Sequence, residues 1–148
     1  MPLPPLPLEA IILGSDAPTW RDAVRAAGSA LVASGAALPG YSEEMIRMIE
    51  QHGPYVVIAP GLALAHARPG PDVLADGLSI VTLASPVRFG HPRNDPVSVV
   101  LGLAVASAEE HLTSVAELAN VFNDSRAIPE LAAATTPGQV QRIMGVAS

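Results

Sequence analysis

Apolar residues recur along the first third of the chain at the spacing of a strand followed by an amphipathic helix. A short apolar run at 11–13 predicts a strand, and the turn-forming sequence from Gly14 ends it. Helical periodicity follows in one apolar stripe, formed by Trp20, Val24, Ala27, Leu31 and Val32. Either Asp16 or Thr19 can cap this helix, and Gly35 ends it.

Further helices are indicated by their start signals. One is predicted from about Ser42 to His52, with acidic residues in the first turn, where the helix dipole favours them. The sequence Ser107-Ala-Glu-Glu110 matches an S-x-x-E capping box, and apolar residues follow it at helical spacing to Phe122. Two short helices are predicted in the tail, at about 126–134 and 137–144.

Three continuous apolar runs, at 55–59, 78–83 and 97–105, read as buried strands. Because these strands alternate with the helices, the fold class is α/β, a single domain in which helices cover both faces of a sheet. We expect residues 1–8 to be an extended, Pro-rich leader and 9–148 to be the domain. The leader lacks the basic region of a signal peptide, and no apolar run is long enough to span a membrane.

Charge and composition narrow the available chemistry. Of the 148 residues, eight are basic and fourteen acidic, which gives a net charge of −6, so a nucleic-acid partner is not expected. All eight basic residues are Arg, so Schiff-base chemistry and a P-loop lysine are excluded. The absence of Cys excludes thiol nucleophiles and thiolate metal sites. Carboxylates, hydroxyls and four histidines remain: His52, His66, His91 and His111.

His66 is the first candidate among these four histidines. It lies with Arg68 in the Pro- and Gly-containing connection 59–71, which leaves a predicted buried strand, a common place for functional residues in α/β proteins. Histidine is a competent nucleophile near neutral pH, and arginine suits phosphoryl oxygens. The alternative is a loop histidine that only bonds backbone carbonyls.

The other histidines have stronger structural alternatives. His111 lies in the first turn of its predicted helix, on the face directed at the core, where it could simply close the helix edge. His91 lies in a turn-rich loop at 89–96, and His52 complements the dipole at a helix C-terminus. The histidine spacings match no metal-binding motif, so we assign no metal site.

The segment 50–69 contains two motifs, E-Q-H-G-P-Y and A-P-G-L-A-L-A-H-A-R-P. It resembles IIA components of the sugar phosphotransferase system, in the mannitol/fructose-type superfamily, and specifically the ascorbate-type branch. Trp20–Val24 resembles the start of that branch's first long helix. His91 with Asn94-Asp95-Pro96-Val97 matches the family pattern H-x-x-N-D-P-V, and His111 stands at its second histidine position.

This resemblance implies a mannitol-type IIA fold and a cytoplasmic phosphotransferase that needs no cofactor. The carrier protein HPr would phosphorylate His66, and the group would pass to a cognate IIB protein and, through it, to a membrane IIC permease and an ascorbate-like sugar. His111 would orient His66 or bind the phosphoryl oxygens, with Arg68 and His91 as weaker supporting candidates. The acidic surface suits the encounter with a basic donor. The sequence leaves the oligomeric state open, a homodimer included.

Two departures from the family pattern bear on the site. The residue before the active histidine is usually proline, which would fix the approach to His66. Ala65 stands there instead, and the sequence leaves the effect of this difference open. Mannitol-type relatives use an arginine in the preceding helix. Arg47 lies near that place, but an insertion alters its spacing, so Arg47 is left unassigned. A regulatory module, whose phosphorylation controls partner proteins, is the alternative function.

Overall fold

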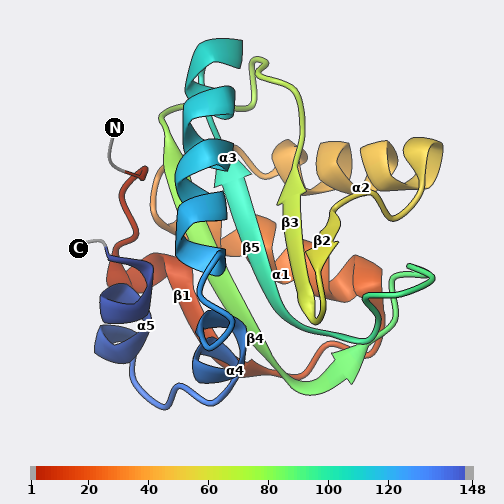
Figure 1. Cartoon of the computed structure of the whole chain (residues 1–148). Coiled ribbons are helices and arrows are strands. Elements are labelled where there is room, and N and C mark those ends of the chain that lie inside the picture. Colours follow the sequence, from red (N-terminus) through yellow and green to blue (C-terminus); the bar gives the residue numbers. More distant parts are fainter. Residues whose placement is uncertain (1–2, 146–148) are drawn as a thin grey trace.

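A computed structural model describes residues 3–145 and contains a mixed five-stranded sheet in the order β1-β4-β5-β3-β2 (Figure 1). The strands are β1 (Ile11–Ser15), β2 (Val57–Ala59), β3 (Leu62–His66), β4 (Gly77–Val87) and β5 (Val97–Ala104). The pairs β1–β4 and β3–β5 are parallel, whereas β4–β5 and β2–β3 are antiparallel. Strand β5 is thus central, and β3 lies beside it.

Helices cover both faces of this sheet, which confirms the predicted class. They are the 3₁₀-helix η1 (Leu8–Ala10) and the α-helices α1 (Trp20–Ala33), α2 (Gly40–His52), α3 (Ala108–Phe122), α4 (Ala127–Ala132) and α5 (Pro137–Met144). Helices α3, α4 and α5 lie in front of the sheet in Figure 1, and α1 and α2 lie behind it. Between residues 3 and 145, no helix is long and apolar enough to cross a membrane.

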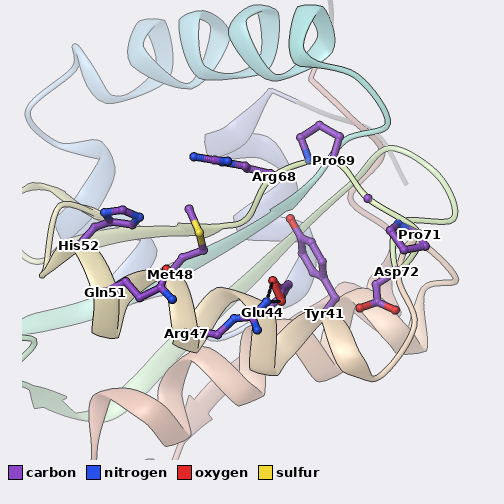
Figure 2. A pocket seen from close by; sticks show the side chains of 11 residues that line it. Tyr41, Glu44, Arg47, Met48, Gln51, His52, Arg68, Pro69, Pro71 and Asp72 are labelled. Carbon is purple, nitrogen blue, oxygen red and sulfur yellow. Dashed lines mark hydrogen bonds and ion pairs between the residues drawn. The ribbon is translucent and has the colours of Figure 1, made fainter.

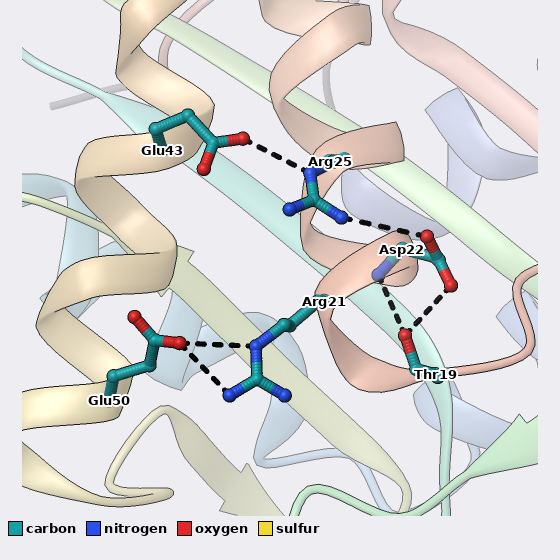
Figure 3. Close-up of polar contacts among 6 residues, drawn as sticks. All are labelled: Thr19, Arg21, Asp22, Arg25, Glu43 and Glu50. Atoms are coloured by element: carbon teal, nitrogen blue, oxygen red, sulfur yellow. Dashed lines mark hydrogen bonds and ion pairs between the residues drawn. The ribbon is translucent and has the colours of Figure 1, made fainter.

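Of the two candidates for the start of α1, Thr19 is the cap. Its hydroxyl accepts a hydrogen bond from the Asp22 amide and donates one to the Asp22 carboxylate (Figure 3). Ion pairs then join α1 to α2 on the surface, Arg21 with Glu50 and Arg25 with Glu43 (Figure 3). Because these pairs are exposed, each contributes at most about 1 kcal/mol, and packing must determine how closely the helices approach.

The close approach of α1 and α2 depends on Gly28. A Cβ atom at this position would lie 1.9 Å from the Oγ atom of Ser42 and 3.1 Å from its Cα atom. Only glycine therefore allows the backbones to pack at this separation. This contact fixes α2, the helix that carries Tyr41, Met48 and His52 to the site described below.

The strand prediction was wrong in one region, residues 55–66. The run at 55–59 was predicted as a buried strand, but β2 begins only at Val57 and is the edge strand, with the Ile58 side chain 48% exposed. The residues after Gly61 were predicted as a loop, but they form β3. Pro60 and Gly61, which has a φ of 82°, make the turn between the two strands.

Side-chain alternation along β3 explains where His66 points. Ala63 and Ala65 belong to the core under α1 and α2, whereas Leu62 and Leu64 pack in the second core with Leu118 of α3. Successive side chains of a strand point to opposite faces, so His66 has the direction of Leu62 and Leu64. The histidine therefore faces the side of the sheet covered by α3.

The N-terminal segment packs onto the same side as α5. Leu6 is fully buried in the second core, its carbonyl oxygen accepts a hydrogen bond from the Gln141 side chain, and the Pro5 carbonyl accepts one from the Leu78 amide. These contacts tie residues 5–6 to β4 and α5. The predicted boundary between residues 8 and 9 stays a prediction.

Candidate active site

His66 is the last residue of β3, and a hydrogen bond fixes its ring. Its Nδ1 atom lies 2.9 Å from the carbonyl oxygen of Leu64. A carbonyl oxygen can only accept, so the proton of the neutral ring resides on Nδ1. Nε2 is therefore left with its lone pair free for attack on an electrophile.

Two aromatic side chains pack against the His66 ring. His111, from the first turn of α3, has its ring centre 5.0 Å away at an interplanar angle of 47°. Tyr55, in the turn before β2, packs edge-on with ring centres 5.6 Å apart. The Ser107 hydroxyl caps α3 by accepting from the Glu110 amide, which fixes the turn that carries His111. The structure thus brings together the two histidines that the sequence singled out.

Burial lowers the pKa of His66 below its ordinary value of 6.5. The hydrogen bond to the Leu64 carbonyl opposes this shift, and the neighbouring His111 adds to it. Both the tautomer and the lowered pKa favour a neutral imidazole at physiological pH. A neutral imidazole is the form of histidine that can act as a nucleophile.

The lowered pKa predicts how His66 responds to acid. In an NMR titration, we expect the His66 ring to protonate with a midpoint below 6.5, and the nucleophilic form to be lost only as the pH falls through that midpoint. As the pH falls, His66 in the unfolded chain takes up a proton before His66 in the folded chain does. The group therefore has no effect on stability well above pH 6.5, and stability falls as the pH drops from there through the folded midpoint. A midpoint above 6.5 would contradict the desolvated position of the ring.

A cavity of about 390 Å³ opens at the His66 ring. The lining residues come from α2, from the turn before β2, from the end of β3 and the segment after it, and from the start of α3. They are Met48, His52, Tyr55, His66, Ala67, Arg68, Pro69, Ala108 and His111. Arg68 is exposed and makes no ion pair with another residue in the described range 3–145. Its guanidinium group is thus available to an anion brought to His66.

A second cavity, of about 490 Å³, adjoins the first and shares Arg68, His52 and Met48 with it (Figure 2). Arg47 lines this second cavity but not the one at His66, and its guanidinium group is paired with Glu44 on the same helix (Figure 2). Arg47 is therefore near the site but directed to a neighbouring carboxylate.

His91 is not brought to His66. Its Nδ1 atom accepts hydrogen bonds from the amides of Arg93 and Asn94, and the Asn94 carbonyl accepts one from Gly61, at the start of β3. His66 is five residues further along the strand, roughly 16 Å at the usual rise. The structure gives His91 a role in shaping the turn before β5. Asp95 has a similar role, since its carboxylate accepts from the amides of residues 89–91.

The chain before His66 is held by the sheet, although Ala65 stands where the family usually has proline. Ala65 is fully buried within β3, and it pairs with Gly102 of β5. The sheet ladder therefore fixes the chain before His66 without a proline.

Sequence reasoning missed two tyrosines at this site. Tyr55 was predicted inside a strand, although it stands 40% exposed beside His66. No sequence pattern indicated a role for Tyr41, which is buried below the segment after β3. The motif E-Q-H-G-P-Y was the available signal for Tyr55, because a Gly-Pro pair before an aromatic residue favours a turn over a strand.

Across residues 3–145, no group of three or more His, Asp or Glu side chains is placed to hold a metal ion. The arrangement instead offers an imidazole with a free Nε2 atom, a second imidazole beside it, and an unpaired arginine two residues away. Such a site can bind a small anionic group covalently at the Nε2 atom of His66 and stabilise the oxygens of that group during its transfer.

Known proteins share both the sequence and the fold of this chain. The family model for the phosphoenolpyruvate-dependent sugar phosphotransferase system, EIIA 2, matches residues 5–145. The ascorbate-specific EIIA component of Shigella boydii is 38% identical over 133 residues, which cover 89% of this chain and 86% of that protein.

Two solved structures from Escherichia coli are also similar. The crystal structure of the mannitol IIA protein has a TM-score of 0.83 and 29% identity, and the alignment covers 95% of this chain and 99% of that one. The mannitol IIA chain in a complex with phosphorylated IIB has a TM-score of 0.82 and 27% identity over the same shares. The resemblance stated from the sequence is therefore confirmed: the chain belongs to the EIIA 2 family of the phosphoenolpyruvate-dependent sugar phosphotransferase system, as a IIA component.

Proposed function

We propose that this protein carries a phosphoryl group on the Nε2 atom of His66, received from phosphorylated HPr and delivered to a cognate IIB protein in the cytoplasm. The single observation that carries the proposal is the hydrogen bond from Nδ1 to the Leu64 carbonyl, which leaves Nε2 as the free nitrogen beside an open cavity. The lowered pKa of His66 keeps that nitrogen unprotonated.

The transfer is an in-line displacement at phosphorus. The Nε2 lone pair forms the new N–P bond, while the bond from phosphorus to the donor nitrogen of HPr breaks and its electron pair returns to the donor ring. The His66 ring gains positive character as the bond forms. The proton on Nδ1 stays in place, and its hydrogen bond to the Leu64 carbonyl strengthens with that charge. Delivery to IIB reverses these bond changes toward an acceptor on the partner.

His111 and Arg68, which both line the cavity, support this transfer. The His111 ring is 5.0 Å from that of His66, close enough to donate to an oxygen of a phosphoryl group on Nε2. Ala108 and His111 also bring the start of α3 to the cavity, where the positive end of the helix dipole favours an anion. The exposed Arg68 offsets the charge of the incoming group.

The relatives support the choice of partner and sugar. One structural neighbour is bound to a phosphorylated IIB protein, which supports a IIB acceptor here. The curated relative is ascorbate-specific, which supports an ascorbate-like sugar taken up through a IIC permease. The net charge of −6 supports rapid encounter with a donor that has a basic face.

Phosphoryl labelling tests the proposal directly. The protein is incubated with labelled phosphoenolpyruvate, the first enzyme of the system and HPr, and then with the IIB protein of the ascorbate system. We expect an acid-labile, base-stable label on this chain that depends on HPr and is lost on addition of IIB. No label would overturn the proposal. A label that stays when each available IIB protein is added would instead favour the regulatory module.

His111→Ala should slow transfer without unfolding the protein. The ring is half-buried at a helix start, so its removal exposes no large core surface, but it deletes a donor to the phosphoryl oxygens. We expect onward transfer to IIB to fall about 10–100-fold, with little change in melting temperature. The pKa of His66 should also rise, because one of the causes that lower it is removed. Unchanged transfer rates would leave His111 with a structural role only.

A further inference from the structure

A side chain continues the hydrogen-bond ladder where β3 ends. His66 is paired with Leu103 of β5, and the next residue, Ala67, is outside the strand. The Ala67 amide donates to the Tyr41 hydroxyl at 3.1 Å, and that hydroxyl donates to the Leu103 carbonyl at 2.7 Å. The phenolic oxygen thus stands between the two strands directly after His66, in the place of a backbone rung.

The Tyr41 hydroxyl forms a bridge between Ala67 and Leu103 that is buried, and the hydroxyl stays protonated at physiological pH. Tyr41 is 1% exposed, and Ala67 and Leu103 are also buried, so water is kept from all three groups. Burial raises the pKa of Tyr41 to about 12. The hydroxyl therefore keeps the proton that it donates to Leu103 while it accepts from Ala67. Without it, a buried amide and a buried carbonyl lose their partner.

The bridge connects α2 to the site from the opposite side of the sheet. Tyr41 projects from α2 toward the segment that contains Arg68 and Pro69 (Figure 2). His111 approaches His66 from α3, on the other face. The direction of the His66 ring depends on the backbone at residues 66 and 67, and Tyr41 holds that backbone to β5.

We propose that Tyr41 is a positioning residue for phosphoryl transfer, because its hydroxyl fixes the chain after His66 and thereby the aim of Nε2 into the cavity. This inference rests on the proposed function of His66. A misplacement of about 1 Å at a reacting atom costs roughly 100-fold in rate, so loss of one rung here has a large kinetic effect.

The test compares Tyr41→Phe with a matched loss of a buried hydroxyl elsewhere, Ser79→Ala. The Ser79 hydroxyl is fully buried and donates to the Ala27 carbonyl at 2.8 Å, under α1 and away from the cavity. We expect both variants to melt roughly 2–6 °C lower than the wild type. Only Tyr41→Phe should slow labelling of His66 from HPr, by about 10–100-fold. Only this variant should also shift the ¹⁵N resonances of the His66 ring.

A second variant retains a polar group at the same place. Replacement of Tyr41 by 4-aminophenylalanine keeps a donor to Leu103 but weakens the acceptor for Ala67. We expect its labelling rate to be roughly threefold below that of the wild type and above that of Tyr41→Phe. This variant decides the question if Tyr41→Phe does not fold. The inference is overturned if the 4-aminophenylalanine variant is labelled at the wild-type rate, or if Tyr41→Phe and Ser79→Ala are labelled at equal rates.

Failure of the proposed function is distinguishable from failure of this inference. If the wild type takes no label on His66, the function fails, and the ring resonances alone decide the role of Tyr41. A shift in Tyr41→Phe but not in Ser79→Ala then supports positioning. If the wild type is labelled on His66 while neither rate nor resonance changes in Tyr41→Phe, the inference fails alone.

Discussion

His66→Ala is expected to abolish labelling by phosphorylated HPr, with a loss of at least roughly 1000-fold. The transfer needs a nucleophile, and the setting of His66 suits its Nε2 atom to that role. Among the histidines of residues 3–145, His66 is the one whose Nδ1 atom bonds a backbone carbonyl at the open cavity, and burial lowers its pKa. Alanine supplies no lone pair, so the first N–P bond cannot form. The measurement is the rate of acid-labile label incorporation at equal protein concentration.

His91→Ala is the matched control for this experiment. The His91 ring accepts two backbone amide hydrogen bonds in a turn at the other end of β3, so its loss affects that turn and not the cavity. We expect its labelling rate to stay within about twofold of the wild type. Equal labelling of His66→Ala and the wild type would show that the phosphoryl group is carried elsewhere. A strong loss in His91→Ala would contradict the separation of the two histidines.

Leu101→Ala is expected to cause the largest loss of stability, about 2–5 kcal/mol. Leu101 is fully buried on β5, where it pairs with Ile80 of β4 on one side and with Leu64 of β3 on the other. Neighbouring strands restrain the backbone, so the site cannot collapse onto the space left by the side chain. A loss of this size is a large part of the stability of a typical domain. Urea unfolding measures the loss in free energy of unfolding, and the dependence of that free energy on urea concentration should be unchanged.

Leu112→Ala is the control for this loss, because it deletes the same atoms from the surface. The Leu112 side chain is 71% exposed on α3, so we expect a change within about 0.5 kcal/mol. Similar losses in the two variants would contradict the burial that defines the second core. A loss below about 1 kcal/mol for Leu101→Ala would show that the sheet relaxes into the cavity.

Helices were predictable because their signals are local. Thr136 and Gln139 form a capping box at the start of α5, and that helix has the predicted bounds. The stripe from Trp20 to Leu31 likewise placed α1 on the sheet. Residues 55–66 were predicted wrongly, since an apolar run does not reveal whether its strand is central or at an edge. The Pro60-Gly61 turn could have been read as a hairpin, but the short strands around it are weakly patterned.

Candidate chemistry was predictable only as residue types. The absence of Lys and Cys left carboxylates, hydroxyls and histidines, and the motifs of the resemblance pointed first to His66 and His111. The sequence offered the same kind of support for His91, which lies in another part of the fold. A motif gives spacing along the chain. It does not give the distance in space between segments that belong to different parts of the fold.

The sequence by itself determined the helical faces, the α/β class, the family and the choice of histidine chemistry, because these depend on local patterns and on which side chains are present. Only the tertiary structure decided which groups meet. Alternation along β3 turned His66 toward α3 and His111, the Leu64 carbonyl selected Nε2, and the close packing at Gly28 helped to place Tyr41 behind the strand end. Each of these contacts either joins segments that are distant in the chain or depends on the direction of a strand. Long-range contacts and strand directions are determined only when the sheet and its two helical layers pack together.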